Sequence, residues 1–251
     1  MPDVVSLHVV DAGTGEVLVS EAPDTVLRTA SVAKVLVLSA LAVALEAGDV
    51  APDEVLSRTV TPRVGDSGLW HLMTTDALPV LDVALLVGAV SDNWATNVLV
   101  DRLGHDAVNA FGLRDTGLWD VVRDTRGPSD PPTLSTGTAR EWTDVLVALH
   151  RRTWVSAAVS ERVLGWLAAG LDHSLVASAF ALDPLVADGA DGALVNKTGT
   201  DTDVRCDVGL VTGPTRVAAY ACLGNGDPAV LVPRLRAVGD RVRDLVAAAP
   251  L

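Results

Sequence analysis

The sequence predicts a mixed α/β fold of the α+β type, in which an antiparallel sheet formed by both ends of the chain packs beside a mainly helical lobe. Strand patterns occur before residue 30 and after residue 171, and apolar helical patterns fill the stretch between them. Of the 251 residues, 49% are hydrophobic and only 20% are charged, enough apolar material for a large core. We therefore expect a sheet lobe from residues 1–30 and 172–251, a helical lobe from residues 31–171, and an active site between them.

The chain begins with a predicted hairpin. Apolar, β-branched residues dominate residues 4–10 and 16–20, and the turn-forming residues 11–15 separate them. The next predicted element is a helix over residues 31–47, which has almost no polar face and is followed by Gly48, where a C-cap glycine is common. A helix that is apolar on all sides is a buried helix, so we expect it in the core.

The middle of the chain predicts four further helices, because apolar residues there run together or recur every three or four residues. These helices are expected at residues 80–90, 94–103, 139–150 and 160–171. The stretch 123–137 contains Pro128, Pro131 and Pro132 and is the one long segment without a regular pattern. Loops of this kind often line functional sites.

The last third of the chain predicts strands and a closing helix. The strands are expected at residues 193–195, 206–211 and 216–223, and the amphipathic helix at residues 233–249. The last two strands flank the turn-forming Gly213 and Pro214, so they are expected to pair as a hairpin. Cys206 and Cys222 are equidistant from Pro214 and are expected to face each other. They could form a disulfide, although free thiols are expected in a reducing compartment.

The charge balance excludes several classes of partner. A net charge of −13 and a pI of about 4.6 would repel nucleic acid, and no basic run is present that would bind an anionic membrane surface. The longest apolar run, residues 35–45, is too short to cross a bilayer. The start of the chain lacks the character of a signal peptide, so a cytoplasmic protein is expected if Met1 is the native start, and an exported one otherwise.

Ser31 and Lys34 form an S-x-x-K pattern at the start of the first apolar helix. This spacing places the lysine one turn after the serine, on the same face. A serine hydroxyl becomes a good nucleophile only when a neighbour takes its proton, and a lysine can do so only if burial or nearby positive charge lowers its pKa. The apolar helix would supply that burial, and its amino terminus would stabilise negative charge on an attacked carbonyl group.

Two further motifs support this chemistry, since the S-x-x-K pattern alone is weak. Residues 91–93 (Ser-Asp-Asn) follow an apolar helix, and residues 197–200 (Lys-Thr-Gly-Thr) follow a predicted strand. The chain uses 17 arginines but only two lysines, and both lysines, Lys34 and Lys197, occupy motif positions. Arginine does not lose its proton, so it could not act as the base at position 34.

With these motifs in this order, the chain resembles the serine β-lactamase and penicillin-binding protein superfamily and is most similar to class A-like enzymes. The likeness covers essentially the whole chain and includes residues 65–70 and 91–104. It implies a β-lactamase/transpeptidase-like fold. It also implies a small-molecule substrate that bears a carboxylate and an acyl group, such as a β-lactam or a related amide or ester.

The resemblance further implies a role for each motif residue. Ser31 would be the acylated nucleophile, Lys34 its general base, and Ser91 the proton relay to the leaving group. The backbone N–H groups of Ser31 and Thr200 would form the oxyanion hole. The substrate amide would contact Asn93, and the substrate carboxylate would contact the strand residues Lys197, Thr198, Gly199 and Thr200. Arg205 would either assist with that carboxylate or lie at the surface.

The sequence departs from class A enzymes at one step. Those enzymes carry a glutamate, and an asparagine four residues later, that position the water which hydrolyses the acyl-enzyme, whereas residues 113–138 contain neither Glu nor Asn. Asp130 is the candidate substitute, and the alternative is that it is a solvated loop charge. Loss of a general base slows the step it serves by about 10²–10⁴-fold. We therefore expect acylation of Ser31 followed by slow release.

Three functions remain open on the sequence. An active-site serine hydrolase or acyltransferase is favoured, because the complete proton-transfer set is present. The alternatives are a β-lactam-binding sensor or sequestering protein without turnover, and a penicillin-binding-protein-like D,D-peptidase. No cofactor is implied, and no metal is expected because the five histidines show no ligand spacing. A monomer is expected.

Overall fold

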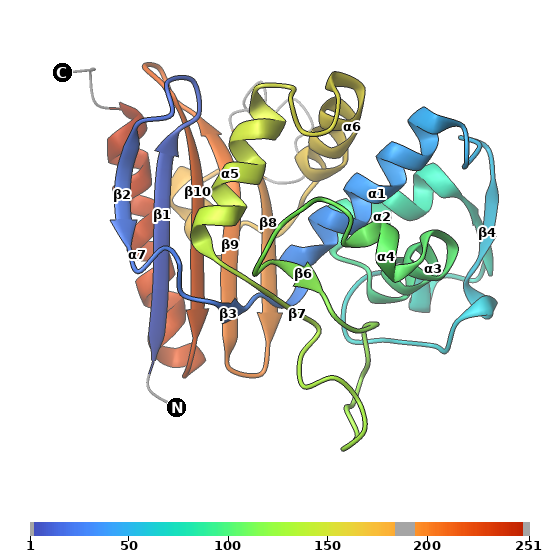
Figure 1. Cartoon of the computed structure of the whole chain (residues 1–251). Coiled ribbons are helices and arrows are strands. Elements are labelled where there is room, and N and C mark those ends of the chain that lie inside the picture. The colour runs from blue at the N-terminus through green and yellow to red at the C-terminus, as the bar shows by residue number, and fades with distance from the viewer. Residues whose placement is uncertain (1–2, 184–193, 248–251) are drawn as a thin grey trace.

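The computed structural model describes residues 3–183 and 194–247 and contains a five-stranded antiparallel sheet (Figure 1). The order of strands across the sheet is β2-β1-β10-β9-β8. Their bounds are Val4–Asp11 for β1, Val17–Glu21 for β2, Leu194–Asp201 for β8, Val204–Thr212 for β9 and Val217–Asn225 for β10. Strands from the two ends of the chain meet where β1 pairs with β10, so the predicted α+β fold is confirmed.

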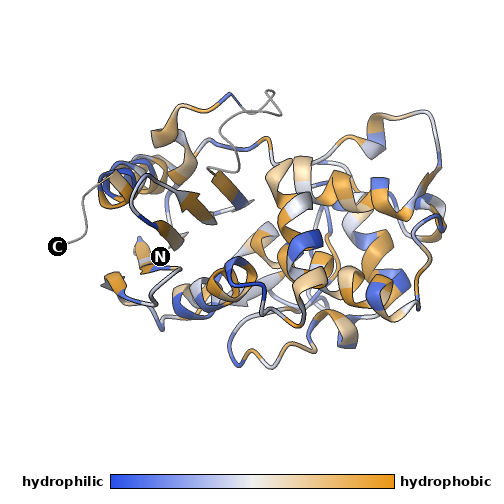
Figure 2. Cartoon of the chain, turned by 90° about the horizontal axis from the view of Figure 1, so that it is seen from above, coloured by the Kyte–Doolittle hydropathy of each residue, from blue (hydrophilic) through white to orange (hydrophobic). Residues whose placement is uncertain are grey.

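Each face of the sheet is covered by a helix. α7 (Pro228–Ala247) packs on one face, where Leu231 lies in a core with Tyr220 of β10. α5 (Ala139–His150) packs on the other face and contributes Trp142 to a second, larger core. Seen from above, the strands lie between α7, next to the C-terminus, and the remaining helices (Figure 2).

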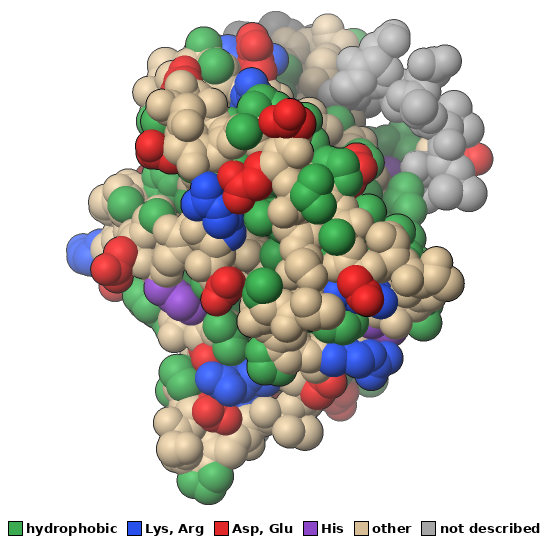
Figure 3. Space-filling view, turned by 90° about the vertical axis from the view of Figure 1, so that its right-hand side faces the viewer, with side chains coloured by type: hydrophobic (Ala, Val, Ile, Leu, Met, Phe, Trp, Pro, Cys, Tyr) green, Lys and Arg blue, Asp and Glu red, His purple; other side chains and the backbone are tan. Residues whose placement is uncertain are grey.

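The helical lobe lies beside β8 at the edge of the sheet (Figure 1). Its helices are α1 (Lys34–Ala47), α2 (Val80–Val90), α3 (Asn93–Leu103), α4 (His105–Val108) and α6 (Ala157–Ala168). Two small sheets accompany them: β4 (Val55–Ser57) with β5 (Ala77–Pro79), and β7 (Ser135–Gly137) between β3 (Leu27–Arg28) and β6 (Gly117–Leu118). Acidic and basic side chains are interspersed on the outer face of this lobe (Figure 3).

α1 is the central helix of the helical lobe, and ten of its 14 residues are buried. Together with the 3₁₀ turn Ala30–Ala33 that precedes it, this helix is long and apolar enough to cross a membrane, which residues 35–45 alone are not. However, 72% of the stretch Ala30–Ala47 is buried inside the fold. Its apolar residues therefore form protein core, as the absence of a polar face predicted.

Most predicted elements occur within a few residues of their expected positions. α2 and α5 have the predicted bounds, and Gly48 ends α1 in the left-handed conformation, with φ of 81°. α1 begins at Lys34 and not at Ser31, because the residues before it form the tighter 3₁₀ turn. The expected start of the strand at Ala193 and the expected end of the last helix at residues 248–249 lie outside the described residues.

The helix predicted at residues 160–171 begins and ends three residues earlier, at Ala157–Ala168. Its start is fixed by Ser156, whose side-chain oxygen accepts a hydrogen bond from the backbone N–H of Val159 at 3.0 Å. The earlier end leaves residues 169–172 as irregular backbone beside β8.

The predicted arrangement of the two cysteines is wrong. β9 and β10 are joined by residues 213–216, so that Cys206 is opposite Leu223, and Cys222 is opposite Asp207. A shift by one residue moves a strand side chain to the other face of the sheet. Cys206 and Cys222 are therefore buried free thiols in different cores, one on the α5 face and the other on the α7 face.

Asp207 is a carboxyl group buried within the sheet. The side chains of Asn196 and Tyr220 donate hydrogen bonds to one of its oxygens, each at 3.0 Å, and the backbone N–H of Ala177 donates to the other at 3.2 Å. Burial raises the pKa of Asp207 to about 7, and the hydrogen bonds only partly oppose this shift. Between the ordinary carboxyl pKa and about 7, the folded protein thus holds a proton that the unfolded chain releases.

We predict that Asp207 makes the protein less stable as the pH rises from about 4 to about 7, by on the order of 4 kcal/mol at most. Its pKa is raised by folding, so its contribution is fully present below the unfolded value of 3.8 and is lost as the pH passes the folded value. Asp207→Asn does not titrate and should flatten this part of a plot of unfolding free energy against pH, measured by urea denaturation. Parallel curves for the two proteins would contradict the assignment.

Candidate active site

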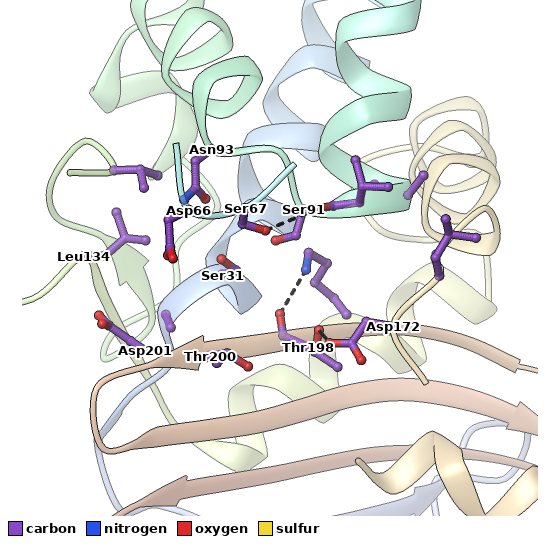
Figure 4. A pocket seen from close by; sticks show the side chains of 18 of the residues that line it. Ser31, Asp66, Ser67, Ser91, Asn93, Leu134, Asp172, Thr198, Thr200 and Asp201 are labelled. Atoms are coloured by element: carbon purple, nitrogen blue, oxygen red, sulfur yellow. Dashed lines mark hydrogen bonds between the residues drawn. The ribbon is translucent and has the colours of Figure 1, made fainter. Parts of the chain in front are cut away.

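A cavity of about 580 Å³ lies between β8 and the helical lobe, and the three sequence motifs meet at its wall (Figure 4). The motif residues that line it are Ser31 before α1, Ser91 and Asn93 at the turn from α2 to α3, and Lys197, Thr198 and Thr200 on β8. The loop between β6 and β7, the segment after α6, the end of α2 and the loop residues Asp66 and Ser67 also line it. The fold thus brings together groups that lie up to 169 residues apart in the sequence.

Ser31 is placed by the 3₁₀ turn Ala30–Ala33 and points into the cavity (Figure 4). Ala30 has a positive φ of 47°, a strained conformation of the kind that occurs at functional sites. β8 packs against this turn at Gly199, where a Cβ atom would lie 2.1 Å from the carbonyl oxygen of Thr29. Glycine in the third motif therefore allows β8 to approach the turn that carries Ser31 this closely.

Lys34 is the first residue of α1, three residues after Ser31, and is completely buried. Its Nζ donates to the backbone oxygen of Ser91 at 2.6 Å and to Oδ1 of Asn93 at 2.7 Å, and it lies 3.1 Å from Oγ of Ser91. Burial lowers the pKa of Lys34 well below its ordinary value, and the charge of Lys197 lowers it further. A neutral amine has two N–H groups, which can donate hydrogen bonds to these two carbonyl oxygens. It also has a lone pair, which can take a proton from a serine hydroxyl.

The turn between α2 and α3 is held by Asp92, which is completely buried. One carboxylate oxygen accepts hydrogen bonds from the backbone N–H groups of Leu69 and Trp70, both at 2.7 Å. The other caps α3 by accepting from the N–H of Ala95 at 2.9 Å. These contacts fix Ser91, which has a left-handed φ of 54° as the C-cap of α2, in the position that meets the lysine.

Lys197 and Thr198 form the β8 side of the cavity. Nζ of Lys197 donates to the backbone oxygen of Thr198 at 2.9 Å. Burial lowers the pKa of Lys197 to about 8, although the charges of Asp172 and Asp207 oppose this shift. Oγ1 of Thr198 donates a hydrogen bond to a carboxylate oxygen of Asp172 at 2.7 Å (Figure 4).

Arg205, which could have assisted with a substrate carboxylate, does not line the cavity. It lies opposite Thr200 across the β8–β9 hairpin, and its Nη1 donates to the backbone oxygens of Asp201 and Val204 at 2.9 and 2.7 Å. The guanidinium therefore contacts the hairpin turn, a position that fits the surface interpretation of Arg205 and not contact with a substrate carboxylate.

Asp130, the candidate for the deacylation base, also lies outside the wall of the cavity. Its carboxylate accepts a hydrogen bond from the N–H of Gly127 at 2.8 Å and lies 3.5 Å from the guanidinium of Arg123. These partners hold it within its own loop, so it is not placed to activate a water at Ser31. Among the described residues that line the cavity, none is a glutamate.

Sequence reasoning assigned no role to five charged residues of the wall, which are Asp66, Arg123, Arg126, Asp172 and Asp201. Asp172 was not considered because the preceding helix was predicted to continue to residue 171. The loop that carries the two arginines was identified by its prolines as a segment that could line a site, but its arginines were not given a role. Both arginines contact the nearly buried carboxylate of Asp120, Arg123 at 2.8 Å and Arg126 at 3.5 Å.

Within the described part of the chain, no group of three or more His, Cys, Asp or Glu side chains could hold a metal ion.

We predict that Asp92→Asn destabilises the protein by about 2 kcal/mol or more, because an amide NH₂ cannot accept the backbone N–H groups that the carboxylate accepts. The free energy of unfolding from urea denaturation would measure this loss. The matched control is Asp101→Asn on the same helix, where the side chain is exposed, and its effect should stay within about 0.5 kcal/mol. Equal effects of the two substitutions would show that Asp92 does not anchor the turn.

Comparison with known proteins gives one family and many similar structures. The model of the beta-lactamase enzyme family matches residues 1–241. A β-lactamase from Sphaerobacter thermophilus DSM 20745 is 26% identical, with a TM-score of 0.80 over 95% of this chain and 89% of that one. A class A β-lactamase from Mycobacterium abscessus is 16% identical, with a TM-score of 0.77 over 96% and 93%. The search of curated proteins found no match.

A third similar structure is a mutant of PBP-A, solved as an acyl-enzyme complex with penicillin G. It is 22% identical, with a TM-score of 0.78 over 97% of this chain and 90% of that one. The sheet, the helical lobe and the three motifs at their junction thus agree with the similarity, which extends over nearly the whole chain. The chain belongs to the beta-lactamase enzyme family.

Proposed function

We propose that this chain is an active-site serine acyl-transfer enzyme that forms an acyl-enzyme on Ser31 from a lactam, amide or ester. The observation that carries the proposal is the contact of the buried amine of Lys34 with Ser91 and Asn93, next to Ser31. Burying a lysine is unfavourable, and a protein that only bound its ligand would have no need of it. Membership of a β-lactamase enzyme family supports hydrolase chemistry.

In the acylation step, the lone pair of Lys34 takes the proton of the Ser31 hydroxyl while Oγ forms a bond to the substrate carbonyl carbon. The charge that develops on the carbonyl oxygen would be stabilised by the backbone N–H groups of Ser31 and Thr200, each of which is typically worth about 10²–10³ in rate. The hydroxyl of Ser91 then gives its proton to the leaving nitrogen or oxygen as the bond from that atom to carbon breaks. Ser91 regains a proton from the ammonium of Lys34, whose Nζ lies 3.1 Å from its Oγ, so Lys34 returns to the neutral amine.

Asn93 has two roles in this scheme. Its Oδ1 accepts a hydrogen bond from Lys34 and thereby orients the amine. Its Nδ2 lies 3.3 Å from the carbonyl oxygen of Gly65, a long contact that leaves this group able to donate to a substrate amide.

Release of the acyl group is proposed to be slow. Hydrolysis needs a base that activates water, and the described wall of the cavity offers no glutamate, while Asp130 is held in its own loop. Such a loss typically costs about 10²–10⁴-fold in the affected step. The acyl-enzyme should therefore accumulate, and the proposed activity includes transfer to an acceptor other than water.

We predict that intact-protein mass spectrometry after addition of benzylpenicillin will show an adduct that persists for minutes or longer in the native chain. Ser31→Ala should show none. Consumption of penicillin without an adduct would mean efficient hydrolysis and would overturn the slow release. Absence of both adduct and consumption would exclude β-lactams as substrates, and non-covalent binding alone would favour a sensor or sequestering protein. Cleavage of a D-Ala-D-Ala peptide would favour a D,D-peptidase.

We predict that Lys34→Arg lowers the rate of acylation by about 10²–10⁴-fold, because the guanidinium keeps its proton and cannot act as a base. Because burial lowers the pKa of Lys34, acylation by the native chain should slow only as the pH falls through that lowered pKa, well below the ordinary pKa of lysine. The rate of adduct formation against pH measures both effects, with thermal unfolding as the check that the variant is folded. Acylation of the variant within about fivefold of the native rate would contradict the role of Lys34.

A further inference from the structure

The position of Asp172 is unexpected for a site that binds a substrate carboxylate. Its Oδ2 accepts a hydrogen bond from Oγ1 of Thr198 at 2.7 Å, and its Oδ1 accepts one from the N–H of Ser174 at 3.1 Å. Its backbone oxygen accepts a third, from Nδ2 of Asn196 at 3.1 Å. The side chain and the backbone of Asp172 are thus both fixed, on the wall of the cavity next to Lys197.

This carboxylate uses the groups that would otherwise bind a substrate anion. The hydroxyl of Thr198 can donate only one hydrogen bond, and it donates to Asp172. The charge of Asp172 also acts on the amine of Lys197, whose pKa it raises against the effect of burial. A second carboxylate at this place would meet the negative charge of Asp172 and find the hydroxyl already occupied.

The other charges of the wall do not compensate. Two further acidic residues, Asp66 and Asp201, line the cavity and are exposed. The two arginines of the wall, Arg123 and Arg126, already contact the carboxylate of Asp120. The cavity therefore offers an anion less positive charge than its count of basic residues indicates.

We propose that Asp172 is a specificity-determining residue that occupies the anion site at Lys197 and Thr198 with its own carboxylate and selects acyl donors that are uncharged at that position. This inference rests on the proposed acylation of Ser31, and it replaces the expected substrate carboxylate with a neutral ester or amide group. The catalytic set is unaffected, since no hydrogen bond joins Asp172 to Ser31, Lys34 or Ser91 among the described contacts.

The test compares benzylpenicillin with its methyl ester, two compounds that differ only in the carboxylate. The native chain should acylate faster with the ester. Asp172→Asn removes the charge but keeps an oxygen that can accept the hydrogen bond from Thr198. It should raise the ratio of the acylation rate constant for penicillin to that for the ester by about tenfold or more, mainly because acylation by penicillin becomes faster. The matched control, Asp201→Asn, removes another charge of the wall and should change the ratio by less than about threefold.

Binding measured in a Ser31→Ala background separates this inference from the proposed function. If neither compound acylates Ser31 in any variant, the proposed function fails, but calorimetry or ligand-observed NMR can still compare the affinities for the two compounds with and without Asp172→Asn. A rise in affinity confined to the penicillin supports the inference. The inference is overturned if the ratio of the affinities for penicillin and ester is the same with and without Asp172→Asn, which includes a parallel change for both compounds. It is also overturned if neither protein binds either compound.

Discussion

The burial of the Lys34 amine is the constraint on which the rest of the site depends. A lysine without access to water needs hydrogen-bond acceptors for its N–H groups, and here the backbone of Ser91 and the side chain of Asn93 provide them. That requirement fixes the distance between α1 and the turn from α2 to α3. It also determines where the hydroxyl of Ser91 lies, so the three residues proposed for proton transfer also contribute to packing.

Close approaches of backbone hold this arrangement in place. The carboxylate of Asp92 accepts hydrogen bonds from three backbone N–H groups that belong to two segments. Gly68, with φ of 102°, leaves room for this carboxylate, because a Cβ atom there would lie 2.3 Å from Cγ of Asp92. Gly199 gives β8 the same freedom beside the turn that carries Ser31. Asp92 and Gly199 thus shape the site through the backbone contacts that they make or allow.

The sequence predicted features that depend on neighbouring residues and did not predict those that depend on tertiary contacts. Apolar runs ended by Gly48 and Gly104 predicted helices well, and three motifs with two lysines predicted the core of the site. The 3₁₀ turn before Lys34 could not be told from helix, because both patterns place the same residues on one face. The sides taken by Cys206 and Cys222 depended on a single residue of hairpin length. The contact of Asp172 with Thr198 joins residues 26 apart in the sequence. Arg205 and Asp130 have partners close in the sequence, but no pattern shows that their side chains turn back onto their own hairpin or loop instead of entering the cavity.

The sheet has its first strand paired with its last, and this has a consequence for synthesis on the ribosome. β10 begins 206 residues after β1 ends, and β8, which carries one wall of the cavity, also emerges late. A nascent chain that holds only β1 and β2 has a two-stranded hairpin, which is marginally stable in water. Non-local pairing of this kind is slow and leaves apolar surface exposed in the meantime. Ser31 is therefore translated early, whereas the strand that forms the opposite wall of its cavity is translated only when most of the polypeptide has been made.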